Sequence, residues 1–586
     1  MIENTKFPLP KTIKRFQREF FESKDDFTYI GNGSFGGKAL GLLFIHDKLV
    51  KSCENNTGFE NIRVSIPKST IITTELFDIF MKRNNLYDLF SNKNISDEDI
   101  VLEFQQAELP TELLGDLRAL ISKVHSPLAI RSSSLIEDSI DAPFAGIYAT
   151  KMIPNNQSET TMRFRKLSDA IKFVYASTFF KSAKDYISSI DLNINNEKMA
   201  VIIQECVGNL YDDYFYPNIS GVVRSYNFYA FGKSKPQDGM GSLALGLGKT
   251  IVDGSNSWNY SLTNPKAPPP YNSISDLLKL SQNKFWAVDM SKQTKYDPVK
   301  ETEFMKLLEL KEAEFHGNLQ PIASTYDPAS DRIAFGTHVN GPRLLNFTQI
   351  LDFEEVKLNK LLLHIVDLCK DMFKEDVEIE FALNFDHKNY KNVRFAFLQV
   401  RPIAVSNENT TVESSELLQS DNLLSSDVVL GNGSDNNIKD IVFVKPEVFD
   451  KSKTRQIANE LELINKDCLR ENINYLLIGF GRWGSQDEWL GIPVDWGQIS
   501  KAKVIIEATL PAIDVEISQG SHFFHNLTGF KIPYFSVKHN SKFSIDWDWL
   551  NSQKMIKETS FLKHVRLSRP LNVKVDGKKG IGVVKK

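Results

Sequence analysis

Residues 126–138 read Ser-Pro-Leu-Ala-Ile-Arg-Ser-Ser-Ser-Leu-Ile-Glu-Asp, and Ala-Pro-Phe-Ala-Gly-Ile-Tyr follows at 142–148. An apolar run that ends in Arg-Ser-Ser predicts a strand that presents the Arg131 guanidinium together with neighbouring hydroxyls. Such a group suits a polyphosphate, because it combines positive charge with hydrogen-bond donors. The alternative interpretation is an ordinary strand-to-turn junction with a surface salt bridge.

The bulk composition is that of an ordinary soluble globular protein. The chain has 586 residues, which predicts roughly three or four folding units of about 150 residues each. The net charge of −4 gives no basic surface for nucleic acid. The four cysteines form no CxxC pair, so neither a zinc site nor a disulfide framework is indicated. The sequence shows neither a secretory leader nor an apolar run long enough to cross a membrane, so we expect a cytoplasmic protein.

Helical and strand-like patterns alternate over residues 20–405, which predicts an α/β or α+β fold. The apolar spacing predicts a helix over 113–124. Runs of β-formers predict strands at 199–206, 377–383 and 395–400. Residues 406–437 are dominated by Ser, Asn, Thr and acidic residues, which favours a polar linker. Strand-like runs then return at 441–444, 475–478, 504–506 and 573–575, so we expect a smaller α/β domain over 438–586.

Three glycine-rich segments are candidates for phosphate binding. Gly31-Asn-Gly-Ser-Phe-Gly-Gly-Lys38 precedes an apolar helical run, so backbone N–H groups and a helix N-terminus could face an anion. It also resembles a protein-kinase glycine loop, but the other kinase motifs do not occur. Gly246-Leu-Gly-Lys-Thr250 resembles the end of a P-loop, although Leu243 stands where the first glycine is required. Gly479-Phe-Gly-Arg-Trp-Gly484 matches GxGxxG, but the residues after it do not open a helix, which favours a tight turn over a dinucleotide site.

The segment 126–148, combined with the earlier Gly36-Gly-Lys38, resembles the nucleotide-grasp domain of phosphoenolpyruvate synthase and pyruvate phosphate dikinase. In that family an AVRSS–ED–SFAG segment follows a GGK segment, in the same order as here. Further family motifs follow in order, as VVQ, SGV, GLGE–VxG, DIEF and LQxRP. The corresponding segments are Val201-Ile-Ile-Gln204, Ser220-Gly-Val222, Gly246-Leu-Gly248 with Val252-Asp-Gly254, Glu378-Ile-Glu-Phe381 and Leu398-Gln-Val-Arg-Pro402.

This resemblance implies a two-lobed ATP-grasp domain over residues 1–405, split near residue 200, and it implies ATP and Mg²⁺ as ligands. Lys38 and Arg131 would hold phosphates, Glu380 and Gln399 would approach magnesium, and Arg401 would contact the transferring phosphoryl group. The remaining ATP contacts it implies are Gly36, Gly37, Ser132, Gln204, Gly246 and Gly248. Glu378, Glu137 and Asp138 are secondary candidates, and alternating carboxylates at Glu378 and Glu380 are also compatible with a solvated strand edge. Lys249 departs from the family, which often has an acid there, and this puts one ATP contact in doubt.

The C-terminal region resembles the swivelling phosphohistidine domain of the same family. Gln519-Gly-Ser-His522 and the later Ile532-Pro533 have the family's spacing, so His522 aligns with the phosphorylated histidine. The small alanines that follow in the family are replaced by Phe523 and Phe524. His525 lies three residues further on, so three interpretations stay open: a working phosphohistidine at His522, a structural remnant, or a metal site that uses both histidines.

The function predicted from this resemblance is a phosphotransferase of the phosphoenolpyruvate synthase type. Phosphoryl would pass from Mg-ATP to His522 and then to an unidentified small molecule or protein. The family's large phosphoenolpyruvate-binding barrel has no room between the two matched regions, so we do not expect phosphoenolpyruvate synthase activity from this chain by itself. The alternative is a catalytically silent ATP-binding sensor. We expect no nucleic-acid or membrane partner, and a homodimer is one expectation for the oligomeric state.

Overall fold

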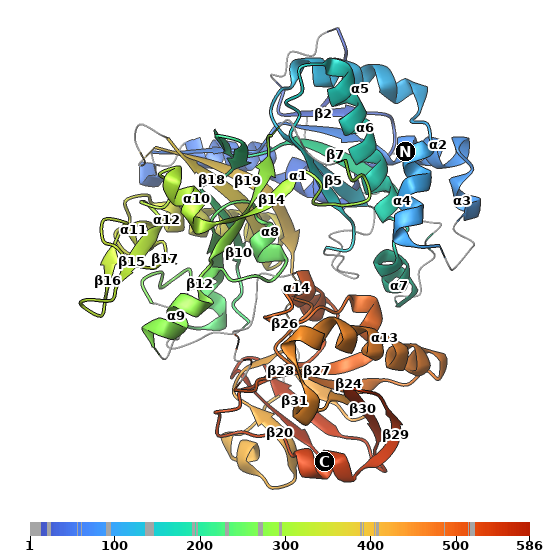
Figure 1. The fold of residues 1–586 in the computed structure, drawn as a ribbon, viewed down its shortest axis with the longest axis vertical. Coiled ribbons are helices and arrows are strands. Elements are labelled where there is room, and N and C mark those ends of the chain that lie inside the picture. The colour runs from blue at the N-terminus through green and yellow to red at the C-terminus, as the bar shows by residue number, and fades with distance from the viewer. Residues whose placement is uncertain are drawn as a thin grey trace.

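The structure is a computed structural model, shown in Figure 1. It describes residues 13–19, 25–54, 57–59, 61–89, 95–134, 146–189, 194, 197–228, 234–267, 273–291, 296–386, 390, 392–403, 405, 410–485, 487–511, 513, 515 and 522–586. The mixed α/β fold predicted from the sequence is confirmed. Two lobes built from the first 403 residues lie above a C-terminal domain in the view of Figure 1.

The first lobe is a six-stranded sheet in the order β1-β2-β4-β7-β5-β6, with helices packed against it. Its strands are β1 (Lys14–Arg15), β2 (Phe27–Ile30), β4 (Ser69–Ile72), β5 (Leu128–Ser134), β6 (Thr150–Ile153) and β7 (Met199–Glu205). Its helices are α2 (Thr74–Arg83), α3 (Leu86–Leu89), α4 (Asp97–Gln106), α5 (Thr111–Lys123), α6 (Thr160–Ser177) and α7 (Lys181–Ser189). The helix predicted over 113–124 and the strand predicted over 199–206 are therefore both present.

The second lobe centres on a six-stranded sheet in the order β12-β11-β10-β18-β19-β3. Its strands are β3 (Ile62–Ser65), β10 (Ile219–Arg224), β11 (Met240–Ala244), β12 (Trp258–Ser261), β18 (Val377–Phe385) and β19 (Val393–Pro402). Its helices are α1 (Gly36–Glu54), α8 (Lys249–Val252), α9 (Ile274–Leu280), α10 (Leu310–Phe315), α11 (Thr348–Leu351) and α12 (Leu358–Phe373). Although β3 and α1 come early in the chain, β3 pairs with β19 and α1 packs against both β19 and β5.

Two smaller sheets complete the second lobe. Their strands are β8 (Asn209–Tyr211), β9 (Tyr214–Tyr216), β13 (Lys284–Asp289) and β14 (Met305–Glu309) in one, and β15 (Ala323–Asp327), β16 (Arg332–Phe335) and β17 (Arg343–Leu345) in the other. No helix in the described part of the chain combines the length and the apolar composition that a membrane span requires.

The C-terminal domain contains a seven-stranded sheet in the order β21-β28-β27-β24-β23-β30-β29 and a four-stranded sheet in the order β20-β32-β31-β22. Its strands are β20 (Asn422–Ser426), β21 (Val429–Leu430), β22 (Gly433–Asp435), β23 (Asp440–Val444), β24 (Tyr475–Phe480), β25 (Arg482–Trp483), β26 (Gly491–Ile492), β27 (Ala502–Ala508), β28 (Tyr534–Val537), β29 (Lys554–Glu558), β30 (Leu562–Arg566), β31 (Asn572–Asp576) and β32 (Ile581–Lys585). Its helices are α13 (Thr454–Arg470), α14 (His522–Gly529) and α15 (Trp547–Ser552).

The expected polar linker over 406–437 is wrong for residues 422–435, which belong to the C-terminal domain. Strands β20, β21 and β22 lie within it and pair with β32, β28 and β31 of the C-terminal domain. The apolar pairs Leu423–Leu424 and Val429–Leu430 are buried, and they supply the core contacts that a linker lacks. The polar residues around these pairs make the short edge strands difficult to predict from the sequence. The C-terminal domain therefore begins earlier than the expected residue 438.

The glycine-rich segment 479–484 forms the tight turn that its sequence favours. Gly481 and Gly484 have φ angles of 74° and 73°, and the short strand β25 lies between them where a dinucleotide site would open a helix.

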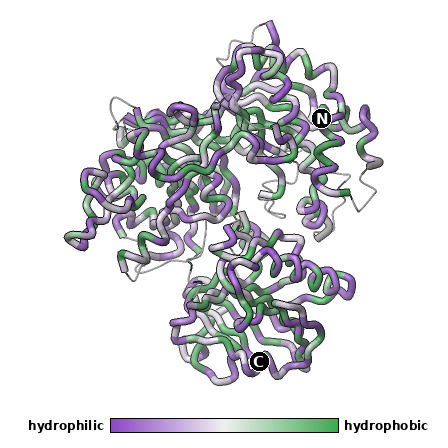
Figure 2. The backbone as a smooth tube through the Cα atoms, viewed as in Figure 1, coloured by the Kyte–Doolittle hydropathy of each residue, from purple (hydrophilic) through white to green (hydrophobic). Residues whose placement is uncertain are grey.

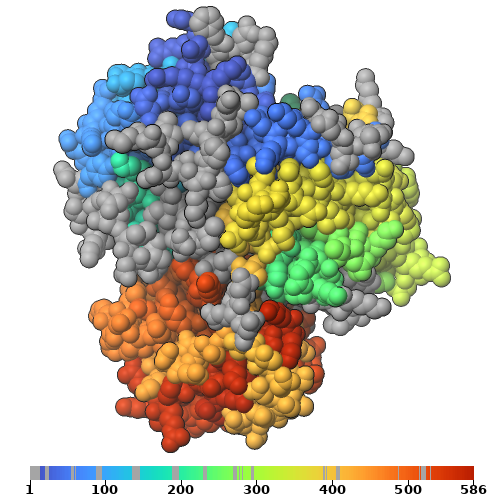
Figure 3. All heavy atoms as spheres, turned by 180° about the vertical axis from the view of Figure 1, so that it is seen from behind, coloured from blue at the N-terminus to red at the C-terminus, as the bar shows by residue number. Residues whose placement is uncertain are grey.

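Buried apolar residues form two large clusters. One fills the second lobe together with α1, and the other runs from the first lobe into the C-terminal domain. Figure 2 shows apolar residues concentrated along the inner strands, and Figure 3 shows the C-terminal domain beneath the two lobes from behind. The C-terminal domain is therefore packed against the lobes in this structure.

Candidate functional site

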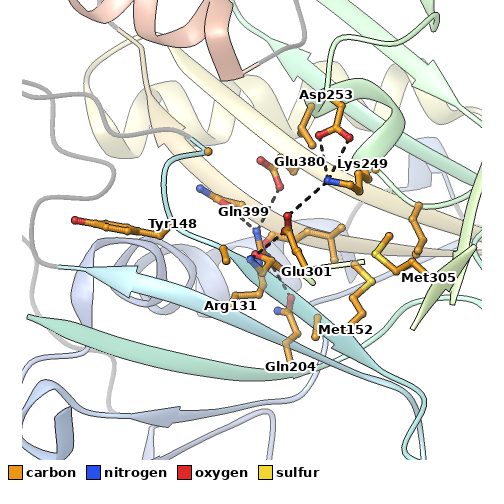
Figure 4. Close-up of a pocket in the computed structure, with 18 of the residues that line it drawn as sticks. Arg131, Tyr148, Met152, Gln204, Lys249, Asp253, Glu301, Met305, Glu380 and Gln399 are labelled. Atoms are coloured by element: carbon orange, nitrogen blue, oxygen red, sulfur yellow. Dashed lines mark hydrogen bonds and ion pairs between the residues drawn. The ribbon is translucent and has the colours of Figure 1, made fainter. Parts of the chain in front are cut away.

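A cavity of about 510 Å³ lies where the two lobes meet (Figure 4). This volume falls within the usual range for small-molecule sites, roughly 300–1,000 Å³. Seven residues predicted from the sequence are part of its lining, namely Lys38, Arg131, Gln204, Gly248, Glu380, Gln399 and Arg401. The fold therefore brings side chains from segments more than 350 residues apart, such as Lys38 and Gln399, to one cavity.

Arg131 on β5 connects the two lobes at the centre of this cavity. Its Nη1 donates to Gln204 Oε1 in the first lobe at 3.2 Å and to the carbonyl oxygen of Leu398 in the second lobe at 3.0 Å. Its Nη2 donates to Gln399 Oε1 at 2.6 Å and lies 3.4 Å from Glu380 Oε2. The guanidinium is thus held in place by partners on both sides, with one face toward the cavity (Figure 4).

Glu380 and Gln399 are direct partners in the antiparallel pairing of β18 and β19, and a register shift follows Glu380. Both side-chain oxygens contact the positive charge of Arg131. One carboxylate and one amide oxygen beside a phosphate-sized space are a donor set that suits Mg²⁺, which usually keeps several waters and few protein ligands. The described residues contain no cluster of three or more His, Cys, Asp or Glu side chains, so an all-protein metal cage is not formed there.

Lys38 reaches the cavity from the first turn of α1. Its Nζ donates to Ser132 Oγ on β5 at 3.1 Å. The helix begins at Gly36, whose φ angle is 73° and whose Cα lies so close to β5 that an added Cβ would be 1.9 Å from the Ser133 carbonyl oxygen. The Ala39 N–H donates to Ser133 Oγ at 3.1 Å. These contacts fix the helix start, and they explain why the sequence has glycine there.

The other predicted glycines shape the surroundings. Gly37 follows Gly36 in the first turn of α1, beside the cavity lining. Gly246 has a φ angle of 82°, and its carbonyl oxygen accepts a hydrogen bond from Ser220 Oγ at 2.5 Å. Gly248 precedes α8 and lies in the lining itself. The secondary candidates Glu137 and Asp138 lie outside the described residues.

Glu378 has a different environment from Glu380, two residues away on the same strand. Its side chain is only 1% exposed, so Glu378 neither binds a metal ion in the cavity nor lies on a solvated strand edge. One oxygen accepts from Arg224 Nε at 2.5 Å, and the other accepts from Arg401 Nε at 2.7 Å. Because β18 is paired with β10 and β19, Arg224 and Arg401 stand directly across from it on the two neighbouring strands. Arg401 therefore reaches the cavity while Glu378 holds its other side.

A second charged group in the cavity was not predicted as a site. Lys249 Nζ lies 3.2 Å from Asp253 Oδ2 and 3.8 Å from Glu301 Oε2. Burial opposes the charge on Lys249, but the two carboxylates outweigh it and raise its pKa. Burial also raises the pKa of Asp253, partly offset by Lys249. The spacing of four residues between Lys249 and Asp253 is the sequence signal for this pair, whereas Glu301 could be placed only by the fold.

The cavity also has an apolar end. Met152 of β6 and Met305 of β14 lie together on one side, and Tyr148 lies away from them (Figure 4). Cys206 also lines the cavity, and burial raises the pKa of its thiol to about 12. A thiol with that pKa is protonated at neutral pH, so it is not a nucleophile of this site.

His522 and His525 both belong to α14, and His522 is its first residue. This helix lies against the second lobe, where the Phe524 ring packs on Arg224 and on Phe228. Close by, Arg482 Nη1 donates to the carbonyl oxygen of Gly254 at 2.7 Å. The helix that begins at His522 is therefore docked next to Gly254, which directly follows the cavity residue Asp253.

The family model of the pyruvate phosphate dikinase AMP/ATP-binding domain matches residues 32–422, about two thirds of the chain. The matched span contains all the cavity residues described above, and it confirms the resemblance predicted from the ordered motifs. No curated protein matches the chain.

Proposed function

This chain belongs to the pyruvate phosphate dikinase AMP/ATP-binding domain family, and on that premise we propose that it is an ATP-dependent phosphotransferase. Mg-ATP binds between the lobes and phosphorylates His522, which then passes the group to an acceptor on another module or partner. Magnesium, the phosphohistidine, the acceptor and a cytoplasmic location are all parts of this proposal. The observation that carries it is the convergence, on one cavity, of cationic side chains from both lobes with the side-chain oxygens of Glu380 and Gln399.

The cationic part of the cavity suits a polyphosphate chain. Lys38, Arg131 and Arg401 reach it from α1, β5 and β19, and Lys249 adds a fourth positive charge. Phosphoryl transfer depends mainly on positioning and on neutralising the charge of the phosphate oxygens. Because Arg131 and Arg401 are each held by partners behind them, their guanidinium groups are positioned before the substrate arrives.

Glu380 and Gln399 would hold the magnesium ion, with phosphate oxygens and waters completing its shell. When bound, the ion would neutralise negative charge on the transferring phosphate. In the structure Arg131 contacts both oxygens, so the pair already lies in a cation-binding arrangement.

The apolar end of the cavity suits the adenine base. The thioethers of Met152 and Met305 are flexible and polarisable, and such groups pack well against flat aromatic rings. With the base at this end, the phosphates extend toward Arg131 and Glu380 (Figure 4).

The transfer step forms a phosphorus–nitrogen bond while a phosphorus–oxygen bond of ATP breaks. A ring nitrogen of neutral His522 donates its lone pair to the phosphorus, and the electron pair of the broken bond leaves on the nucleotide oxygen. Lys38 and Arg401 would stabilise the charge on the moving phosphoryl group. The N-terminal end of α14, where His522 stands, would favour the negative charge of the product.

A nucleotide sensor without turnover is the second candidate. The observation that favours it is the packing of the two aromatic residues after His522. Phe523 packs against Trp496 with ring centroids 5.7 Å apart and the ring planes tilted by 55°, and Phe524 is 2% exposed. Such packing restrains α14, so in this candidate ATP would change the docking of the domain while His522 remains unmodified.

Mass spectrometry of the full chain incubated with Mg-ATP at neutral to alkaline pH separates the two candidates. The phosphotransferase proposal expects one phosphoryl adduct that is lost in His522→Ala and kept in His525→Ala. If no adduct forms while calorimetry shows that ATP still binds, the result favours the sensor. The loss of ATP binding itself would contradict both candidates.

A further inference from the structure

The C-terminal domain contacts both lobes in this structure. On the first-lobe side, Phe530 packs against Tyr186 of α7 with ring centroids 5.4 Å apart, and Lys181 of α7 forms an ion pair with Glu462 of α13. On the second-lobe side the contacts are Phe524 with Arg224 and Phe228, and Arg482 with Gly254. The domain therefore bridges the two lobes on either side of the cavity.

Phe524 makes the central contact on the second-lobe side. Its side chain is 2% exposed, and the Arg224 guanidinium carbon lies 4.8 Å from the ring centroid. The Phe228 ring meets it edge-on at 5.6 Å. A guanidinium over an aromatic face is attracted by the ring quadrupole, and more strongly when both groups are shielded from water.

This contact is linked to the cavity by a short buried chain of charges. Arg224 is 1% exposed and pairs with Glu378, and Glu378 also pairs with Arg401, which lines the cavity. One carboxylate thus serves two arginines. A phosphate near Arg401 would give that arginine a second anionic partner, so that Glu378 could hold Arg224 more firmly in place under Phe524.

A second link joins the interface to the cavity through the backbone. Arg482, which is 7% exposed, donates to the carbonyl oxygen of Gly254. The preceding residue, Asp253, lines the cavity and pairs with Lys249. A ligand that draws Lys249 away from Asp253 would therefore act on the residue next to the Arg482 contact.

We propose that Phe524 is a positioning residue that makes docking of the C-terminal domain depend on the nucleotide, through Arg224, Glu378 and Arg401, with Arg482 and Gly254 as the second contact. The inference rests on the proposed function, since docking brings the start of α14 to the second lobe beside the cavity. It also gives the bulky side chain at 524 a role: the aromatic ring anchors the domain in the position from which transfer takes place.

The test measures docking separately from chemistry. Donor and acceptor dyes on Leu102→Cys in the first lobe and Met555→Cys in the C-terminal domain report the distance between them, because both positions are exposed, at 45% and 57%. Three native cysteines are buried, and the fourth, Cys206, has its pKa raised to about 12, so labelling favours the introduced thiols. A non-hydrolysable Mg-ATP analogue supplies the nucleotide without transfer.

Phe524→Leu keeps an apolar side chain but removes the ring, and Phe523→Leu is the matched control because its ring faces Trp496 of its own domain. We expect the analogue to raise energy transfer in the parent protein and in Phe523→Leu, and to raise it much less in Phe524→Leu. The rate of phosphohistidine formation should fall at least about tenfold in Phe524→Leu. ATP affinity should fall by the factor by which the nucleotide favours docking, because coupling between two equilibria is reciprocal. Phe228→Leu tests the same contact from the opposite side and should behave like Phe524→Leu.

Equal nucleotide responses in the parent protein, Phe524→Leu and Phe228→Leu would overturn the inference, as would an equal loss in Phe523→Leu. If the parent protein forms no phosphohistidine, the proposed function fails, but the energy-transfer response to the analogue still decides whether Phe524 couples docking to the nucleotide. The two failures are therefore distinguishable.

Discussion

At the scale of single residues, Arg131 has the most specific role in the cavity. Its guanidinium holds Gln204, Leu398 and Gln399 in a fixed geometry that a lysine cannot reproduce. We expect Arg131→Lys to weaken Mg-ATP binding roughly 10- to 100-fold, because one or two charged hydrogen bonds are lost. Isothermal titration calorimetry checks this, with Arg118→Lys on the exposed face of α5 as the control. Equal affinities in both variants would contradict the role assigned to Arg131.

Glu378 is important for stability in a way that its neighbour Glu380 is not. Replacing it by glutamine leaves the buried Arg224 and Arg401 without an anion, and breaking a buried pair in this way costs roughly 3–5 kcal/mol. We expect Glu378→Gln to lower the midpoint of urea unfolding, followed by tryptophan fluorescence. The exposed residue Glu375, three positions earlier, provides the control Glu375→Gln, which should unfold like the parent protein. Similar midpoints for both variants would show that the triad adds no stability.

The two glutamates also show which residues a sequence can assign. The position of Glu380 and Gln399 in the cavity could be predicted, because they fall in motifs whose order along the chain is informative. The partners of Glu378 could not be predicted, since they depend on the register of β10, β18 and β19, which brings Arg224 and Arg401 to either side of it. Glu301 could not be predicted as a site residue for the same reason, because its contact with Lys249 forms only when two distant segments fold together.

At the scale of secondary-structure elements, the start of α1 is the most constrained glycine position of the site. We expect Gly36→Ala to destabilise the protein by roughly 2–5 kcal/mol, because the added Cβ meets the Ser133 carbonyl oxygen and the φ angle of 73° is unfavourable for alanine. Gly248→Ala is the matched comparison: its φ angle is −58° and the nearest heavy atom, Ser220 Cβ, is 3.8 Å away. Its stability should change by about 1 kcal/mol or less. Thermal unfolding of both variants tests this difference, and equal melting temperatures would contradict it.

Strands with continuous apolar runs were predicted well, whereas short polar strands were not. β7, β18, β19, β24 and β27 are rich in β-formers, and their existence follows from local sequence. β20 and β22 carry Asn, Ser and Asp, and they become strands because β32 and β31 are present to pair with them. The composition of a segment indicates how many apolar side chains it can bury, but it does not indicate which sheet edge the segment will pair with.

At the scale of the whole molecule, the arrangement of the C-terminal domain could not be predicted from the sequence. The resemblance indicated a swivelling domain and left its resting position open. The contacts that define that position pair residues hundreds of positions apart, such as Lys181 with Glu462 and Arg482 with Gly254. These two contacts pair polar or charged groups that look like solvated surface when either segment is considered alone.

The contact between Lys181 and Glu462 makes docking sensitive to acid. Burial disfavours the charge on Glu462, but hydrogen bonds from Lys181, Lys466 and Gln498 outweigh it and lower its pKa from 4.5 to about 2. Lys466 and Gln498 belong to the same domain as Glu462, so undocking removes only the part of this shift that Lys181 contributes. The ion pair therefore stabilises the docked state above pH 4.5 and loses that contribution as the pH falls toward 2. We expect energy transfer between the dyes at Leu102→Cys and Met555→Cys to decline over this window, before far-UV circular dichroism reports unfolding. In the variant Glu462→Gln the side chain at position 462 is uncharged at every pH, so energy transfer should decline less steeply over the same window. The nearby acid on α7, Asp185, is unchanged in this variant. Parallel curves for the two proteins would mean that this ion pair does not hold the C-terminal domain against the first lobe.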